Sequence, residues 1–366
     1  MVQSSRKRVL IVDDAVVVRR ALSDALARDP ELEVAGTASN GRLALAKFAQ
    51  LHPDVILLDI EMPEMDGLEA VVELRKLDRH VPIIMFSTLT ERGASATLEA
   101  LSRGATDYVT KPSNQDMETT SHTVSEELIP KIKALCTPRA AAFPRPGTTA
   151  LRSASPTTPP LVRKPPLQGS AVKVITIGVS TGGPEALARL LPTLPKDLGV
   201  PVVIAQHMPP VFTALLAARL ATKCALTVRE CAPGEPLVPG TVWIAPGDFH
   251  MVVSREDGTL RLRTNQGPRE NYCRPSVDVL FRSVASVFGS KALGVILTGM
   301  GQDGLKGCES LIAEGSRVIV QDEASSVVWG MPGFVARAGL AEKILALSEI
   351  GPEIERRVCG TLHAVR

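Results

Sequence analysis

Residues 172–187 set the architecture of the second half of the chain, and they read Val172-Lys-Val-Ile-Thr-Ile-Gly178-Val-Ser180-Thr-Gly182-Gly183-Pro184-Glu-Ala-Leu187. An apolar run rich in β-branched residues ends at Gly178. Good helix formers follow Pro184, which suits a first helical turn. The pattern predicts a strand, a tight turn and a helix, with Ser180 at the corner. Glycines there let the backbone approach a ligand, and the free N–H groups of a helix start favour negative charge.

This corner is compatible with several functions. The segment Gly178-Val-Ser180-Thr-Gly182 fits the G-x-S-x-G nucleophile elbow, in which a serine attacks an acyl group. A strand, a Gly-rich turn and a helix equally describe a phosphate cradle, and a serine at this place can simply cap the helix. Short motifs of this kind often match by accident, so the rest of the chain decides between these interpretations.

Composition limits the possible classes of protein. A length of 366 residues is typical of two domains, and 45% hydrophobic content is ample for buried cores. A formal charge of +2 and 3% aromatic residues argue against a nucleic-acid binder or a membrane-surface protein.

Targeting signals and cysteines point to the cytoplasm. The basic start is followed by an apolar run that stops at Asp13-Asp14, too soon for a signal peptide, and no run is long enough to span a bilayer. The six cysteines show no metal-ligand spacing. We therefore expect a cytoplasmic protein with free thiols, most of them packed in the core.

Strand and helix patterns alternate over residues 6–135. Strands are expected at 8–12, 33–38, 55–58, 82–86 and 107–110, and helices at 16–27, 42–51, 68–77, near 95–102 and before Cys136. Five β/α repeats with near-continuous apolar strands indicate a parallel sheet covered on both faces. Sites in such sheets form beyond the carboxyl ends of the strands.

Polar side chains stand at those strand ends, namely Asp13, Asp14, Asp59, Ser87 and Lys111. Three carboxylates from neighbouring strands repel one another unless a hard cation lies between them, and Mg²⁺ takes such oxygen ligands. With Mg²⁺ and Lys111 neutralising charge, a carboxylate here can receive a phosphoryl group, and Asp59 is the natural acceptor. A helix cap, a turn or a solvated charge explains each residue alone, but not the whole set.

The first domain has a specific family resemblance. Together with Met62-Pro63, Asp66-Gly67 and Tyr108-Val-Thr-Lys111-Pro112, the set resembles the receiver domain of bacterial two-component response regulators. The resemblance implies a (βα)5 flavodoxin-like fold and phosphorylation of Asp59 from a sensor histidine kinase. It also implies Mg²⁺ held by Asp14, Asp59 and the main-chain carbonyl of Glu61, with Asp13 close by, and contacts from Ser87 and Lys111 to the phosphoryl oxygens.

Residues 136–171 separate the receiver from the second domain. Their composition shifts to Pro, Ser, Thr, Ala and Arg with no acidic residue, which predicts a semi-extended tether. No helix-turn-helix or comparable nucleic-acid reader comes after it. The predicted domains are therefore 6–135 and 172–366.

Three polar residues of the second domain each follow an apolar strand. Further strands are expected at 201–206 and 292–297, and Ser180, His207 and Asp303 come just past the three carboxyl ends. In a doubly wound, mainly parallel sheet these ends share one edge. His207 would take the Ser180 proton, and Asp303 would orient the imidazole and stabilise its charged form. Singly, His207 could be a core histidine and Asp303 a helix cap.

A competing motif lies in the same region. Gly299-Met-Gly301-Gln-Asp-Gly304 spells G-x-G-x-x-G, with Asp322 and Glu323 near the offset of a ribose-binding acid. Against a dinucleotide site, Asp303 would add repulsion where a pyrophosphate needs positive potential, and the motif comes late in the domain. The order Ser, His, Asp also differs from that of α/β-hydrolases, so another sheet fold is expected.

The motifs of the second domain carry a second resemblance. They are Gly178-Val-Ser180-Thr-Gly-Gly-Pro184-Glu-Ala186, Gln206-His207-Met-Pro, Ala245-Pro-Gly-Asp-Phe-His250-Met251, Arg274-Pro-Ser-Val-Asp278, Leu297-Thr-Gly-Met-Gly-Gln-Asp303-Gly304 and Trp329-Gly-Met-Pro332. With them the chain resembles the chemotaxis protein-glutamate methylesterases, the CheB family, over both domains. Val179, Val328 and Asn271-Tyr-Cys273 depart from the usual family pattern and bear on substrate preference.

This second resemblance implies a phosphorylation-regulated serine hydrolase. Its substrates would be glutamate methyl esters on methyl-accepting chemotaxis receptors, from which it would release methanol. It would also deamidate receptor glutamines. Ser180 would be the nucleophile, His207 the base and Asp303 its orienter, with the backbone near Met300 at the oxyanion. His250 is expected only to pack. No cofactor for ester hydrolysis, no nucleic acid and no membrane insertion are expected. The alternative is a catalytically idle second domain that serves as a phosphorylation-dependent interaction module.

Overall fold

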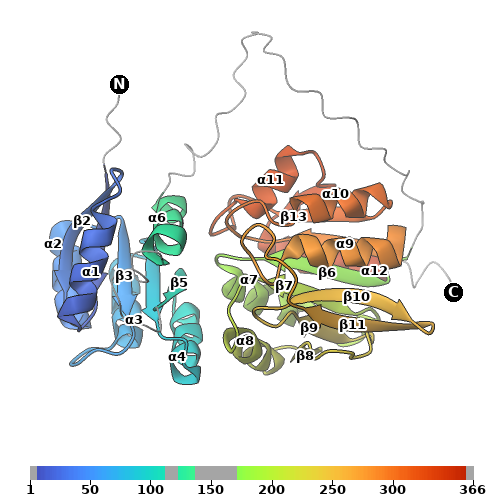
Figure 1. The fold of residues 1–366 in the computed structure, drawn as a ribbon, viewed down its shortest axis with the longest axis horizontal. Coiled ribbons are helices and arrows are strands. Elements are labelled where there is room, and N and C mark those ends of the chain that lie inside the picture. The colour runs from blue at the N-terminus through green and yellow to red at the C-terminus, as the bar shows by residue number, and fades with distance from the viewer. Residues whose placement is uncertain (1–5, 112–122, 137–170, 360–366) are drawn as a thin grey trace, which may run out of the picture. The chain divides into compact units, whose positions relative to one another are not determined.

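The computed structural model describes residues 6–111, 123–136 and 171–359, which form two compact units, each built around a large sheet (Figure 1). Pro112, nearly all of the predicted linker 136–171 and residues 360–366 of the predicted second domain lie outside the described residues. The domain bounds 6–135 and 172–366 stay predictions. Among the described helices, none combines the length and the apolar character needed to cross a bilayer.

A five-stranded sheet organises the first part of the chain. In order, the elements are β1 (Lys7–Val12), α1 (Val16–Leu26), β2 (Leu32–Ala38), α2 (Gly41–Leu51), β3 (Val55–Asp59), α3 (Gly67–Leu77), β4 (Ile83–Ser87), α4 (Glu91–Ser102), β5 (Asp107–Thr110), the π-helical turn η1 (Val124–Leu128) and α6 (Ile129–Cys136). The strand order is β2-β1-β3-β4-β5, and β1 pairs in parallel with β2 and β3, as β3 does with β4. The expected β/α repeats are confirmed.

Burial of this sheet explains its apolar strands. Residues of β1 and β3 pack with the buried side of α1, including Leu22 and Leu26, and with η1 and α6, where Leu128 and Ile132 are fully buried. All five residues of β3 are buried, although the last of them, Asp59, is an acid. A carboxylate in that position needs a partner or a proton.

A seven-stranded sheet organises the second unit. Its elements are β6 (Val174–Val179), α7 (Gly183–Leu190), η2 (Leu191–Thr193), β7 (Val202–Gln206), α8 (Phe212–Ala221), β8 (Thr227–Glu230), β9 (Thr241–Ile244), β10 (His250–Glu256), β11 (Thr259–Asn265), α9 (Val277–Phe288), η3 (Gly289–Lys291), β12 (Ala292–Ile296), α10 (Leu305–Ala313), β13 (Arg317–Gln321), α11 (Met331–Arg337), β14 (Lys343–Leu345) and α12 (Leu347–Cys359). The order is β14-β13-β12-β6-β7-β9-β8, and every neighbouring pair is parallel.

The central strand of this sheet, β6, is the one that directly precedes Ser180. β6 lies between β12 and β7, so the three strands that precede Asp303, Ser180 and His207 are neighbours (Figure 1). The predicted parallel sheet is thus confirmed. The antiparallel hairpin β10–β11 was not predicted from the sequence; it forms a separate two-stranded sheet.

One face of the large sheet is covered by α9, α10 and the hairpin. Helix α9 buries residues at helical spacing, including Val277, Leu280 and Phe281, and these join Leu311 of α10 and Met251 of β10 in one core cluster. The apolar stripe of α9 therefore holds the helix against the sheet, with its first turn directed at the loop that carries Asp303.

The β6–α7 corner has the conformation that the sequence predicts. Gly182 adopts a left-handed φ of 76°, the Gly183 N–H donates to Ser180 O at 2.8 Å, and Pro184 lies in the first turn of α7. A Cβ atom on Gly183 would lie 2.0 Å from Gln206 Oε1 and 2.7 Å from a methyl of Val179. Only glycine lets the corner pack against the end of β7.

We expect Gly183→Ala to lower the free energy of unfolding of the second unit by about 1–3 kcal/mol, because the added methyl overpacks a buried corner. Urea denaturation of the full chain measures the change. Gly240→Ala is the comparison variant: Gly240 has a φ of 74° and open space around it, so its alanine reports the cost of a left-handed backbone without a clash, whereas Gly183 has no positive φ and its alanine reports the clash. Equal stability of Gly183→Ala and the parent protein would refute the packing argument.

Candidate active site and phosphoryl-acceptor site

Ser180 and His207 directly follow the adjacent strands β6 and β7, so the two residues lie side by side. Val179 pairs with Gln206 in the β6–β7 ladder, so the next residue on each strand is a neighbour across the strand spacing of about 4.8 Å. The His207 N–H donates to Val179 O at 3.1 Å, and the Ser180 N–H donates to Thr298 O at 3.0 Å. The Gln206 side-chain amide donates to both Ser180 O and His207 O at 3.1 Å.

Asp303 joins this edge from the loop after β12. Its Oδ2 lies 2.8 Å from His207 Nε2, and its side chain is 2% exposed. The same carboxylate accepts the N–H groups of Val277 at 2.7 Å and Asp278 at 3.1 Å, at the start of α9. It also accepts the hydroxyl of Ser276 at 2.9 Å. The structure therefore brings His207 and Asp303 together.

These donors keep the Asp303 carboxylate ionised. Burial raises its pKa, but the hydrogen bond and charge of His207 and the N–H groups of Val277 and Asp278 outweigh burial and lower the pKa to about 2. A fixed negative charge at Nε2 means that this nitrogen carries a hydrogen and donates it. The tautomer of His207 therefore leaves Nδ1 as the nitrogen that can accept a proton.

Asp278 is a second buried carboxylate, and it holds the start of α10. Its Oδ1 accepts the N–H groups of Gly304 at 3.0 Å and Gly307 at 2.7 Å, and burial raises its pKa. Asn271 bridges the two acids, donating to Asp278 Oδ2 at 2.9 Å and to Asp303 Oδ1 at 3.0 Å. In a dinucleotide site built on the G-x-G-x-x-G motif, a pyrophosphate would bind the N–H groups at the start of α10. Here the Asp278 carboxylate already accepts those N–H groups, which contradicts a dinucleotide site.

Cys273 is the neighbour of His207 that the sequence analysis did not identify. Its Sγ lies 3.4 Å from His207 Nδ1. Burial lowers the pKa of His207, but the charge of Cys273 and the hydrogen bonds that the imidazole makes with Asp303 and Cys273 raise it to about 10. Within residues 171–359 the imidazole makes no hydrogen bond to Ser180 Oγ, so in this conformation the Ser180–His207 contact is not closed. Catalytic hydrogen bonds often tighten only when substrate binds.

The Met300 backbone follows Gly299, which lies against Ser180. A Cβ on Gly299 would be 2.8 Å from Ser180 Cβ, and Gly299 O accepts the N–H groups of Gly330 at 3.0 Å and Met331 at 2.8 Å. In the described part of the second unit the Met300 N–H has no hydrogen-bond acceptor, so it is available to an oxyanion.

His250, by contrast, has both ring nitrogens occupied. Its Nδ1 accepts the Ser276 N–H at 3.2 Å, and its Nε2 donates to Pro268 O at 2.9 Å. With 2% of its surface exposed, His250 packs between the hairpin and α9 and has no nitrogen left for proton transfer.

The polar residues expected in the first domain also gather at one sheet edge. Carboxylate oxygens of Asp13, Asp14 and Asp59 lie within 4.8 Å of one another. Lys111 Nζ contacts Asp13 Oδ2 at 2.9 Å and Asp59 Oδ2 at 2.8 Å. An all-oxygen set of three acids suits a hard divalent cation such as Mg²⁺, and Glu61 lies two residues beyond Asp59.

Asp59 is poorly stabilised as an anion without such a cation. Burial raises its pKa, and the nearby charge of Asp13 adds to the effect. Lys111 and the Ile60 N–H oppose it, and the pKa of Asp59 is about 6.

The loop after Asp59 folds back closely, because the Gly67 N–H donates to Ile60 O at 2.8 Å and a Cβ at Gly67 would meet Asp59 O at 2.1 Å.

Ser87 ends β4, the strand next to β3. In this structure its hydroxyl donates to Gly93 O at 3.1 Å and accepts from Thr97 Oγ1 at 2.7 Å. The hydroxyl is therefore occupied by α4, and a contact from Ser87 to a phosphoryl group stays a prediction.

We expect Asp59→Asn to stabilise the first unit at neutral pH by about 1–3 kcal/mol. The pKa of Asp59 rises from 3.8 to about 6 on folding, so the folded state holds the proton more tightly than the unfolded state. The stability that Asp59 contributes is therefore complete below about pH 4 and is lost as the pH rises through 6, where the buried carboxyl ionises. An asparagine amide does not ionise and loses no stability in this range. Urea denaturation at about pH 4 and pH 7.5 measures the difference, which should vanish at the lower pH and shrink when Mg²⁺ is added. Asp24→Asn, on the exposed side of α1, is the control, and an equal gain at both pH values would contradict the argument.

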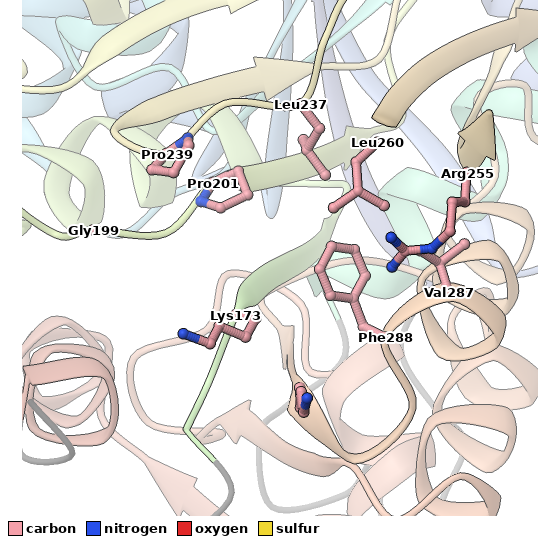
Figure 2. Close-up of a pocket in the computed structure, with 10 residues that line it drawn as sticks. Lys173, Gly199, Pro201, Leu237, Pro239, Arg255, Leu260, Val287 and Phe288 are labelled. Carbon is pink, nitrogen blue, oxygen red and sulfur yellow. The ribbon is translucent and has the colours of Figure 1, made fainter. Parts of the chain in front are cut away.

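A separate pocket lies at the opposite edge of the seven-stranded sheet (Figure 2). Its volume is about 480 Å³, and it is lined by Lys173, Gly199, Pro201, Leu237, Pro239, Arg255, Leu260, Val287, Phe288 and Lys291. Figure 2 shows Leu237, Leu260 and Phe288 gathered at its centre, with Lys173 and Arg255 on different sides. Lys173 and Pro201 precede β6 and β7, so the pocket is remote from Ser180 and His207, which follow the same strands.

The fold and the sites together define a class of protein: a five-stranded receiver-type unit with clustered acids at its sheet edge, followed by a parallel-sheet unit with a serine, a histidine and an acid at one edge. Comparison with known proteins gives the family. Residues 9–120 match the response regulator receiver domain, and residues 175–354 match the CheB methylesterase family. The chain belongs to the CheB family of response-regulator methylesterases, as the sequence resemblance implied.

Individual relatives span nearly the whole chain. A protein-glutamate methylesterase/protein-glutamine glutaminase of a Nocardioides species is 53% identical, covering 96% of this chain and 95% of its own length. One of the same name from Trichodesmium erythraeum is 48% identical, with 96% and 99% covered. The crystal structure of the Thermotoga maritima CheB methylesterase catalytic domain is 41% identical, with a TM-score of 0.50, covering 51% of this chain and 98% of that one.

Proposed function

We propose that this chain is a cytoplasmic, phosphorylation-regulated serine hydrolase that demethylates glutamate methyl esters on chemotaxis receptors and deamidates receptor glutamines. The observation that carries the proposal is the His207–Asp303 contact of 2.8 Å at the sheet edge where Ser180 leaves the adjacent strand. The names and coverage of the relatives support the substrate class.

The residues suggest a two-step acyl transfer. Ser180 Oγ attacks the ester carbonyl while His207 Nδ1 takes its proton, and the Met300 N–H binds the oxyanion that forms. His207 then gives the proton to the leaving methoxide, which departs as methanol. Water, deprotonated by His207, hydrolyses the acyl-enzyme to glutamate and restores Ser180. Asp303 remains ionised throughout and stabilises the imidazolium.

The same residues would act on a glutamine side chain. Attack on its amide carbonyl would give a tetrahedral intermediate that carries an amino group in place of methoxy. The amino group would take the proton from His207 and leave as ammonia, giving the same acyl-enzyme. Both reactions end in a receptor glutamate. No bound cofactor enters these steps, because every proton is moved by His207.

In the receiver, a sensor histidine kinase would supply the phosphoryl group to Asp59. Asp13, Asp14, Asp59 and the Glu61 carbonyl are the groups that would hold Mg²⁺, and the cation would neutralise charge on the phosphoryl oxygens. Lys111, already 2.8 Å from Asp59, and Ser87 would contact those oxygens. Phosphorylation would then shift the population of the protein toward an active arrangement.

We expect Ser180→Ala to lower methanol release from methylated receptor membranes by about 10⁴-fold or more, because the nucleophile is lost. Gas chromatography of released methanol measures the rate, and circular dichroism checks that the variant is folded. The matched control is Ser286→Ala, which removes an exposed hydroxyl from α9. Unchanged turnover by Ser180→Ala would remove the assignment, and an inactive parent protein would favour the idle interaction module.

Gating by the receiver is tested separately. We expect acetyl phosphate with Mg²⁺ to raise methanol release by the parent protein about 10-fold and to leave Asp59→Asn unaffected, since the amide cannot accept the phosphoryl group. Asp24→Asn should respond like the parent. Activation of Asp59→Asn by the phosphodonor would disprove regulation through this residue.

A further inference from the structure

The two ring nitrogens of His207 have different neighbours, and only one of them is explained by the acyl-transfer chemistry. Nε2 donates to Asp303 at 2.8 Å, so Nδ1 is the atom that would receive the Ser180 proton. That atom is 3.4 Å from the Cys273 thiol. A thiol is thus placed where it competes with Ser180 for the base.

We propose that Cys273 is a positioning residue for His207, whose thiol shares one proton with Nδ1 and so sets how much of the imidazole is free to act as the base. This inference rests on the proposed function. In one form a neutral thiol donates to a neutral imidazole. In the other the S–H bond has broken and an N–H bond has formed, giving a thiolate and an imidazolium. Only the first form has a lone pair on Nδ1 for the Ser180 proton.

The loop around Cys273 holds the sulfur in place and offers its proton a second acceptor. The Cys273 N–H donates to Glu270 O at 2.8 Å, and the Glu270 N–H donates to Cys273 O at 3.2 Å. Cys273 Sγ also lies 3.3 Å from Asn271 O. A rotation of the thiol hydrogen from His207 to Asn271 O therefore frees Nδ1 without moving the loop.

The charges around the pair make His207 the cation that faces the sulfur. Asp303 lies on the far side of the ring, and Asp278 is reached through Asn271. Arg274, next to Cys273 in the chain, is bound to Asp248 at 2.6 and 3.0 Å. A thiolate at Cys273 would thus be stabilised mainly by the imidazolium, as in a cysteine–histidine ion pair.

The first experiment does not require esterase activity. In Ser180→Ala protein, the rate of iodoacetamide alkylation of Cys273 is followed by mass spectrometry from about pH 5 to 10. Because the thiolate is the reacting form, we expect Cys273 to be alkylated at least about 10-fold faster at neutral pH in this protein than in the Ser180→Ala, His207→Gln double variant. Cys224, a half-buried thiol in the same unit, is the internal reference, and its rate should be the same in both proteins. Equal Cys273 rates in the two proteins would overturn the proposal.

The second experiment follows methanol release against pH in Cys273→Ser and Cys273→Ala. The acid limb of kcat/KM reports the base of the free enzyme. Serine keeps a donor of similar size but does not become an anion, so we expect this limb to move to lower pH by about one unit in both variants. A packing role would instead lower the rate by one factor at every pH, and an unmoved limb would reject the proposal.

The two experiments also separate this inference from the proposed function. If the parent protein releases no methanol, the esterase assignment fails, and the dependence of Cys273 alkylation on His207 alone decides whether the two residues share a proton. If Cys273→Ala abolishes methanol release and Ser180→Ala does not, then Cys273 is the nucleophile, and both its positioning role and the serine assignment are wrong.

Discussion

The second unit depends on two buried carboxylates that each hold the start of the other's helix. Asp303 precedes α10 but accepts N–H groups at the start of α9, whereas Asp278 lies in α9 and accepts those at the start of α10. A buried charge is tolerated only when its hydrogen-bonding capacity is satisfied. This reciprocal capping fixes the loop after β12, and the remaining capacity of Asp303 is directed at His207.

A buried carboxylate of the first unit, Asp59, is subject to the same requirement for hydrogen-bond partners but meets it less fully. Asp59 is almost as buried as Asp303, but it has one backbone donor and Lys111 where Asp303 has several donors. Its pKa is therefore raised, whereas that of Asp303 is lowered. Asp303 is therefore held as an anion, whereas Asp59 is readily protonated unless a cation lies near it.

Much of this organisation could be predicted from the sequence, because apolar strands and the polar residues after them are local signals. Strand β5 lies at the predicted Asp107–Thr110, and the strands before Ser180, His207 and Asp303 are adjacent as expected. The contact between Cys273 and His207 could not be predicted. It depends on a loop in which Asn271 and Tyr272 have φ values of 50° and 64°, a left-handed conformation that Asn tolerates but Tyr rarely adopts. The hairpin β10–β11 was missed for a related reason, since it packs as a separate sheet outside the β/α alternation.

The position of β12 next to β6 also affects the order in which the two sheets can form during synthesis. A parallel sheet joins strands that are distant in the chain, so the edge at which Ser180, His207 and Asp303 meet forms only after all three have left the ribosome. The five-stranded sheet, by contrast, draws only on residues that emerge first. During synthesis the chain therefore contains every strand of the first sheet well before β12 can pair with β6 in the second.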